Sequence, residues 1–246
     1  MDATNMAADP QAGAPAPADT SAGAVEENKG NLLPVYFVAD DSGSMTDVIG
    51  EFNAGLTSLL DVMSLDAMAA AKIRFTVMSF SDDVITYLEL ADLRKVEQMP
   101  TFKARHTTRY SVAFVDLLSR IDRDVDLLRQ DGYQVHRPAV FFLSDGEPNS
   151  DDPWREALAE LKNPNWTRHP NIVAFGIGSA DAAVINEVAT RPEFGWMATG
   201  GGADTGKVLA TFFETFTHSL MNSAKNMGAL QIEKPAGFSM AVDIVQ

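Results

Sequence analysis

The sequence predicts an α/β fold, in which an open, doubly wound and mostly parallel sheet carries helices on both faces and one antiparallel edge strand. From residue 33 onward, apolar runs typical of strands alternate with amphipathic helical patterns. The run 139–143 (AVFFL) is apolar at every position, as expected for a strand covered on both faces. Only three residues separate the strands predicted at 72–80 and 84–90. A parallel crossover needs many more residues, so this pair must be an antiparallel hairpin.

The first predicted elements are a strand, a helix, the hairpin and a second helix. Residues 33–39 (LPVYFVA) are apolar and rich in strand-forming residues, which predicts a buried strand. The hairpin strands read KIRFTVMSF and VITYLEL. Apolar residues at helical spacing predict the two helices, the first through Ile49, Phe52, Leu56, Leu59 and Met63, and the second through Phe114, Leu117, Leu118, Ile121, Val125 and Leu128.

The second half continues the alternation of strands and helices. After strand 139–143, Asp152 as N-cap and Pro153 at the first helical position predict the start of a helix. The remaining predicted elements are a strand at 171–177 (NIVAFGI), a short helix at 182–188, a short strand at 196–199 and a final helix at 208–227, whose core face is Phe212, Phe213, Phe216 and Leu220.

The chain of 246 residues suits one domain with terminal segments. Residues 1–30 are rich in Ala, Pro, Gly and acidic residues, and they contain almost nothing that could pack in a core. This composition predicts a disordered leader. We expect the domain at 31–230 and a C-terminal tail at 231–246, whose structure the sequence leaves open.

The composition restricts the class of partner and the kind of site. With 34 acidic and 19 basic residues the formal net charge is -15, which repels nucleic acid and anionic membranes. No run approaches the ~20 apolar residues of a membrane helix, and the N-terminus lacks the apolar region of a secretory signal. We therefore expect a cytoplasmic protein. The absence of cysteine excludes disulfides and thiolate metal sites.

Three polar loops are predicted to meet at the carboxyl edge of the sheet. Asp40-Asp41-Ser42-Gly43-Ser44 follows the first strand, Ser144-Asp145-Gly146-Glu147 follows strand 139–143, and Arg105-His106-Thr107-Thr108 precedes the second helix. In such folds, ligands bind outside the carboxyl ends of the strands. The side chains that can converge there offer only oxygen, which suits hard cations, Mg²⁺ above all, with Mn²⁺ or Ca²⁺ as alternatives. They are Asp40, Ser42, Ser44, Thr108 and Asp145.

The pattern D-x-S-x-S after a buried strand, then a Thr, then a strand ending in SDG, resembles the metal-ion-dependent adhesion site of von Willebrand factor A (vWA) domains. The resemblance implies that Asp40, Ser42 and Ser44 form the first ligand loop, that Thr108 belongs to the second and that Asp145 belongs to the third. The family often has Gly-Gly before the Thr, where this chain has His106-Thr107. Either Thr107 or Thr108 could therefore be the ligand. Thr108 is favoured because Tyr110 and Phe114 then fall on the core face.

The resemblance implies a function in metal-dependent protein–protein binding without catalysis, in which a partner's acidic side chain completes the ion's shell. HRPAVFFLSDGEPNSDDPW further resembles the bacterial subgroup associated with tellurium resistance. That subgroup implies a cytoplasmic role in tellurium resistance or stress response, with stress proteins and with kinase or phosphatase partners.

Two other functional classes have weaker support in the sequence. A metal-dependent hydrolase, such as a phosphatase, would need a general base or nucleophile beside the ion, and Asp41, Glu147 and His106 are the evident candidates. Residues 201–207 (GGADTGK) nearly match a nucleotide-binding P-loop, but Val208 stands where the hydroxyl residue should be. This segment is therefore interpreted as a connector.

Overall fold

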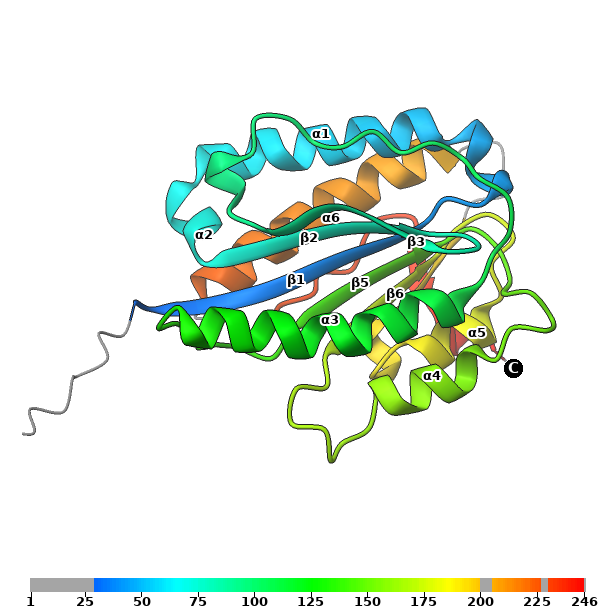
Figure 1. The fold of residues 1–246 in the computed structure, drawn as a ribbon. Helices are drawn as coiled ribbons and strands as arrows, with labels where there is room; N and C mark the ends of the chain where they lie inside the picture. The colour runs from blue at the N-terminus through cyan, green and yellow to red at the C-terminus, as the bar shows by residue number, and fades with distance from the viewer. Residues whose placement is uncertain (1–28, 200–204, 227–229, 246) are drawn as a thin grey trace, which may run out of the picture.

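The computed structural model describes residues 29–199, 205–226 and 230–245, so most of the predicted leader lies outside the described residues (Figure 1). The sheet has the strand order β3-β2-β1-β5-β6-β7-β8, and β4 pairs with β1 outside this path. The strands are β1 (Asn31–Asp40), β2 (Ile73–Phe80), β3 (Val84–Ala91), β4 (Gln134–Val135), β5 (Ala139–Ser144), β6 (Asn171–Gly176), β7 (Gly195–Ala198) and β8 (Phe238–Met240).

Helices cover both faces of the sheet, which confirms the predicted fold class. Figure 1 shows α1, α2 and α6 over one face and α3, α4 and α5 over the other. The helices are α1 (Ile49–Leu65), α2 (Ala67–Ala71), α3 (Tyr110–Gln130), α4 (Trp154–Leu161), α5 (Ala182–Val188), α6 (Thr205–Lys225) and α7 (Ala241–Ile244), with 3-10 turns at Gly43–Asp47, Leu93–Lys95 and Pro192–Phe194. No helix in the described ranges is long and apolar enough to cross a membrane.

The pairing of the strands places the predicted loops at one edge. β1 lies between β2 and β5 and is parallel to both, with Asp40 opposite Phe80 and Ala39 opposite Leu143. The predicted hairpin is confirmed, because β3 is antiparallel to β2 and forms one edge of the sheet. The carboxyl ends of β1 and β5 therefore lie side by side, and each continues directly into one of the loops predicted to bind a metal.

The segment after residue 230 adds a further antiparallel strand, which the sequence analysis missed. β8 pairs with β7 at the other edge of the sheet and is followed by α7. Phe238 is 2% exposed and packs edge-on against Phe175. A three-residue strand after Gly237, whose φ is +78°, is too short to show a periodic pattern. Its position depends on partners that are distant in sequence.

One predicted helix cap is wrong. α4 begins at Trp154, with Pro153 in the cap position and no side-chain cap hydrogen bond. The carboxylate of Asp152 instead accepts a 3.1 Å hydrogen bond from the Ser111 backbone N–H in the first turn of α3. The sequence shows an acidic residue before a helix, but it cannot show that a different helix supplies the nearer free N–H group.

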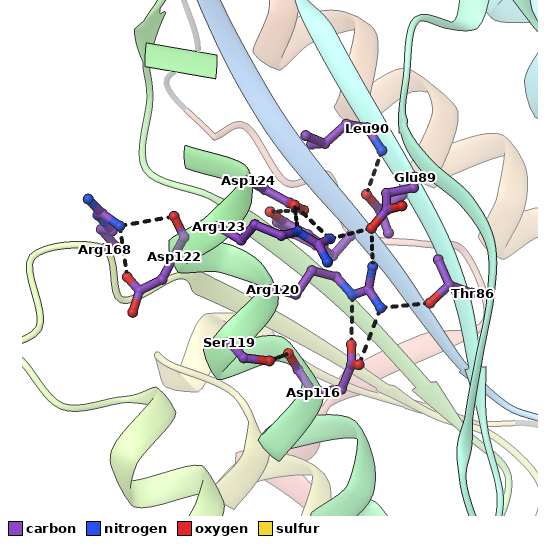
Figure 2. A network of polar contacts seen from close by, with 12 residues as sticks. Thr86, Glu89, Leu90, Asp116, Ser119, Arg120, Asp122, Arg123, Asp124 and Arg168 are labelled. Carbon is purple, nitrogen blue, oxygen red and sulfur yellow. Dashed lines mark hydrogen bonds and ion pairs between the residues drawn. The ribbon is translucent and has the colours of Figure 1, made fainter. Parts of the chain in front are cut away.

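A network of charged side chains holds α3 against the sheet (Figure 2). Arg120 binds Glu89 at 2.9 Å and Asp116 at 2.6 Å, and Arg123 binds both Glu89 and Asp124. Asp124 is 1% exposed and also accepts a 3.1 Å hydrogen bond from the hydroxyl of Tyr36 on β1. These contacts connect α3 to β1 and β3, so they fix the helix whose N-terminal end follows the predicted threonine loop.

Candidate metal site

The first loop begins where β1 ends, and its backbone is arranged around Asp40. Both carboxylate oxygens of this buried residue have partners: Oδ1 accepts a 2.8 Å hydrogen bond from the Ser42 N–H, and Oδ2 accepts a 2.7 Å bond from the Ser144 hydroxyl. The chain then turns through a short 3-10 helix, which brings the Ser42 and Ser44 hydroxyls to 3.0 Å from each other. Ser42 is buried and Ser44 is exposed, so the loop is open on the Ser44 side.

The third loop meets the first through Asp145, which follows β5 and is 6% exposed. The Ser44 hydroxyl donates a 2.7 Å hydrogen bond to Asp145 Oδ1 across a sequence separation of 101 residues. A Cβ atom placed on Gly146 would lie 3.8 Å from Thr108 Oγ1 and 3.9 Å from Ser44 Oγ. The hydroxyls of the first and second loops therefore both lie against the third loop at this glycine.

The structure separates the two threonines of the second loop. Thr107 donates its hydroxyl to Asp82 in the turn between β2 and β3, so this group points to the side of the site. Thr108 is 8% exposed, and its hydroxyl lies near Ser44 and Gly146. Its carbonyl accepts a 2.9 Å hydrogen bond from Asn149, which ties the second loop to the segment after β5. Of the two hydroxyls, that of Thr108 lies among the other predicted ligands.

Burial opposes ionisation of the two aspartates that are predicted to be metal ligands. Burial raises the pKa of Asp40 to about 6, against hydrogen bonds from Ser144 and Ser42 that lower it and a smaller raising effect from the nearby Asp145. Burial also raises the pKa of Asp145, while the Ser44 hydrogen bond acts in the opposite direction. Burial makes the negatively charged forms of both side chains unfavourable. A cation bound between them would offset that cost of ionisation.

The donor set fits a hard divalent cation. The five predicted ligands present two carboxylates and three hydroxyls at adjoining loops, and no nitrogen or sulfur group is among them. Within the described ranges, no group of three or more His, Cys, Asp or Glu side chains forms a metal-binding cluster. The predicted ligand set therefore contains more hydroxyl groups than carboxylates.

A buried ion pair beside the site was missed by the sequence analysis. Asp41 is fully buried, and its Oδ2 accepts hydrogen bonds from Arg105 Nε at 2.8 Å and from the Ser79 hydroxyl at 2.6 Å. Arg105 also binds Asp83 in the β2–β3 turn. Burial raises the pKa of Asp41, while Arg105 acts against this shift. The pair clamps the first loop to the second loop and to the end of β2, and no spacing rule links residues 64 positions apart.

The side chains considered for hydrolytic catalysis form no hydrogen bond with one another in the described part of the chain. Asp41 is engaged by Arg105 and Ser79, as described above. Glu147 and His106 are both exposed. Of the segment that resembles a P-loop, residues 201–204 lie outside the described residues, and Thr205, Gly206 and Lys207 belong to the first turn of α6.

Comparison with known families identifies the fold described above. Residues 35–200 match the von Willebrand factor type A domain. The chain belongs to the vWA family. The matched range contains all three candidate loops, from the end of β1 to Asp145 and beyond. A search of curated proteins gave no match to this sequence.

Solved vWA-like structures share the fold at low sequence identity. Proximal thread matrix protein 1 from the mussel byssus has a TM-score of 0.53 and 16% identity, over 78% of this chain and 49% of that one. The pilus adhesin SpaC from Lactobacillus rhamnosus GG has a TM-score of 0.60 and 15% identity, over 80% of this chain and 31% of that one. This vWA chain thus spans half or less of the length of these proteins. Another mussel structure, with a TM-score of 0.54 and 16% identity over 78% of this chain and 48% of that one, is described as having a zinc-occupied MIDAS (metal-ion-dependent adhesion site) motif.

Proposed function

We propose that this vWA domain binds a divalent cation, Mg²⁺ in preference to Mn²⁺ or Ca²⁺, and through it an acidic side chain of a partner protein. The proposed ligands are Asp40, Ser42, Ser44, Thr108 and Asp145. The observation that carries the proposal is the contact of three loops, in which Ser44 bonds Asp145 and Thr108 lies against Gly146. Membership of a family that commonly mediates metal-dependent protein–protein interaction supports it.

The chain's own residues explain why such a site would favour a carboxylate partner. The negative charge of two carboxylates just balances the positive charge of a divalent ion, and the three hydroxyls are uncharged. The bound cation would supply Lewis acidity at a position open to an incoming oxygen ligand. Ser44 is exposed while Asp40 and Ser42 are buried, so access is from the Ser44 side.

The proposed role is in binding and not in catalysis. Asp41, the buried carboxylate between Asp40 and Ser42 in the first loop, is held by Arg105 and Ser79. Glu147 and His106 are both exposed side chains. The matrix and adhesin proteins that share the fold are in keeping with a binding role.

The sequence around β5 supports a more specific setting. Its resemblance to the tellurium-resistance subgroup leads us to propose a bacterial, cytoplasmic protein of a tellurium-resistance or stress-response system. The partners proposed on that basis are other stress proteins, or a kinase or phosphatase of the same system. The net charge of -15 favours a partner whose contact surface is basic around the acidic residue that reaches the metal.

Affinity capture with the full chain as bait tests the proposal. A partner should be retained with Mg²⁺, released by EDTA, and absent when Asp145→Ala is the bait. Replacing the partner's contact Asp or Glu by Asn or Gln should then remove binding. Retention of the same partners in EDTA would contradict metal-dependent recognition. Hydrolysis of a chromogenic phosphate ester by the wild type, but not by Asp145→Ala, would instead favour a metal-dependent hydrolase.

A further inference from the structure

A cavity lies at the opposite end of the sheet from the candidate metal site. It has a volume of about 500 Å³ and lies where β1 and β2 begin. Because β1 spans ten residues at about 3.3 Å each, the two sites are separated by roughly 30 Å. The lining residues are drawn from the starts of β1 and β2, from the turn after β3, from the segment around β4 and from the end of α6.

Cationic side chains are concentrated around this cavity, although the chain as a whole is strongly acidic. Lys29, Lys72, Arg74 and Arg94 line it, and none of the described acidic residues does. Arg94 is paired with Asp92 through two hydrogen bonds of 2.9 and 2.6 Å. Within the described ranges, the other three cations form no ion pair with a carboxylate. The hydrogen bond from Arg94 lowers the pKa of the Asp92 carboxyl, and the charge of Arg74 also acts on Asp92 in the same direction. Four cationic side chains therefore line the cavity, and Asp92 is the carboxylate that acts on two of them.

The remaining lining groups suit a ligand with a flat or apolar body. Two of the cations lie near the Tyr133 ring, with Lys29 Nζ 5.8 Å and the Arg74 guanidinium 5.6 Å from its centroid. Leu32 and Ala71 supply apolar surface. His136 Nε2 is buried at the cavity and has no hydrogen-bond partner among the described residues.

Packing alone does not explain this combination. Two cations beside one tyrosine ring bring like charges together, and neither of them forms an ion pair with a carboxylate among the described residues. A buried ring nitrogen without a partner also carries a desolvation cost. Arg74 Nη1 donates to the carbonyls of Ile73 at 2.9 Å and Ala71 at 3.3 Å, so its guanidinium is held in place before any ligand arrives.

We propose that this cavity binds a small organic phosphate, with the phosphate held by Lys72 and Arg74 and an aromatic or apolar body packed on Tyr133. The volume is in the range of pockets that enclose a small-molecule ligand, ~300–1,000 Å³. Guanidinium and ammonium groups are the usual partners of phosphate oxygens. His136 Nε2 supplies one further hydrogen bond to the ligand. The proposal does not depend on the function of the metal site.

Calorimetric titration of the full chain in EDTA tests the ligand class, because chelation removes any binding of phosphate through the metal loops. AMP carries both a phosphate and an aromatic base. Inorganic pyrophosphate tests the phosphate without the base, and adenosine tests the nucleoside without the phosphate. We expect AMP to bind at least about tenfold more tightly than adenosine or pyrophosphate, which corresponds to ~1.4 kcal/mol. Absence of AMP binding at millimolar concentration, or equal binding of AMP and adenosine, would overturn the proposal.

Single substitutions test the location. Arg74→Gln and Lys72→Gln, made separately, should each weaken AMP binding by about tenfold or more, because each removes a charge-assisted hydrogen bond. Lys95→Gln is the matched control: it removes the same charge beside Arg94, but Lys95 does not line the cavity. In the wild type, AMP should shift the amide NMR signals of Gly30 and Tyr133 and leave those of Ser42 and Ser44 unchanged. Equal losses in all three variants, or shifts confined to the metal loops, would refute a site in this cavity.

Discussion

Ser44 and Asp145 are joined by a 2.7 Å hydrogen bond between hydroxyl and carboxylate, although 101 residues separate them in the chain. The bond connects the loop after β1 to the loop after β5. Both residues are proposed metal ligands, so the metal site and the folded arrangement of these loops depend on the same contacts. A cation that binds here should therefore stabilise the fold, and substitution of either residue should weaken that effect.

Saturating Mg²⁺ should raise the melting temperature of the full chain by roughly 5–10 °C. A ligand at a hundredfold excess over Kd contributes about 2.7 kcal/mol, and each kcal/mol moves the midpoint of a domain of this size by roughly 2–4 °C. Asp145→Ala should abolish this rise. In EDTA the same substitution should cost less stability than a core substitution does, because it removes a carboxylate whose ionisation is unfavourable in the folded state, as its raised pKa indicates. Differential scanning calorimetry measures both effects. The control is Asp61→Ala on the exposed side of α1, which should respond to Mg²⁺ as the wild type does.

The two adjacent threonines should differ in their effect on metal affinity. Thr108→Ala should weaken Mg²⁺ binding by about ten- to a hundredfold, the loss expected when one contact of ~1.5–3 kcal/mol to a charged group is removed. Thr107→Ala should leave the affinity nearly unchanged, because that hydroxyl binds Asp82 and not the ligand cluster. Isothermal titration calorimetry on the two variants decides between them. A larger loss in Thr107→Ala would reassign the second-loop ligand.

Stability in EDTA should depend on pH through Asp40. Burial raises its folded-state pKa to about 6 from an ordinary value of 3.8, so between these values the folded state keeps a proton that the unfolded chain has released. This group therefore favours folding as the pH falls from 7 to 5 and opposes it above pH 6. Asp40→Asn should melt higher than the wild type at pH 7 and change less between pH 7 and 5.

The same titration should have the opposite effect on metal binding. Protons compete with the cation for Asp40, so the rise in melting temperature caused by Mg²⁺ should shrink between pH 7 and pH 5. Calorimetric scans at both pH values, with Mg²⁺ and with EDTA, separate the two effects. An undiminished Mg²⁺ response at pH 5 would show that Asp40 does not ligate the ion.

Two glycines of α1 should respond to alanine in opposite directions. A Cβ on Gly55 would lie 2.0 Å from the Phe213 ring of α6, so Gly55→Ala must displace packed side chains and should cost about 1–3 kcal/mol. A Cβ on Gly50 meets nothing within 4 Å, and Gly50→Ala should be neutral or stabilise by up to about 1 kcal/mol. Urea unfolding monitored by circular dichroism compares the two. Similar stabilities would show that α1 and α6 do not cross closely at Gly55.

The sequence alone determined the fold class and the position of the candidate loops. Periodic apolar patterns located most strands and helices, and three residues between β2 and β3 required a hairpin. The carboxyl ends of neighbouring parallel strands share one edge of the sheet. This rule predicts from the sequence that Asp40 and Asp145 lie close together. Both inferences depend on local patterns or on general rules of chain topology.

Only the tertiary structure decided which side chains meet. In the fold, the Thr107 hydroxyl binds Asp82, and the buried Asp41 pairs with Arg105. The carboxylate of Asp152 accepts a hydrogen bond from α3 instead of α4, and β8 extends the sheet. The fold also gathers Lys29, Lys72 and Arg74 around one cavity. These contacts join residues that are distant in the chain, and each depends on the direction of single side chains. Such contacts leave no periodic signal in the sequence. Several partners would fit each side chain equally well on local grounds, and the packing of the whole domain decides which of them it meets.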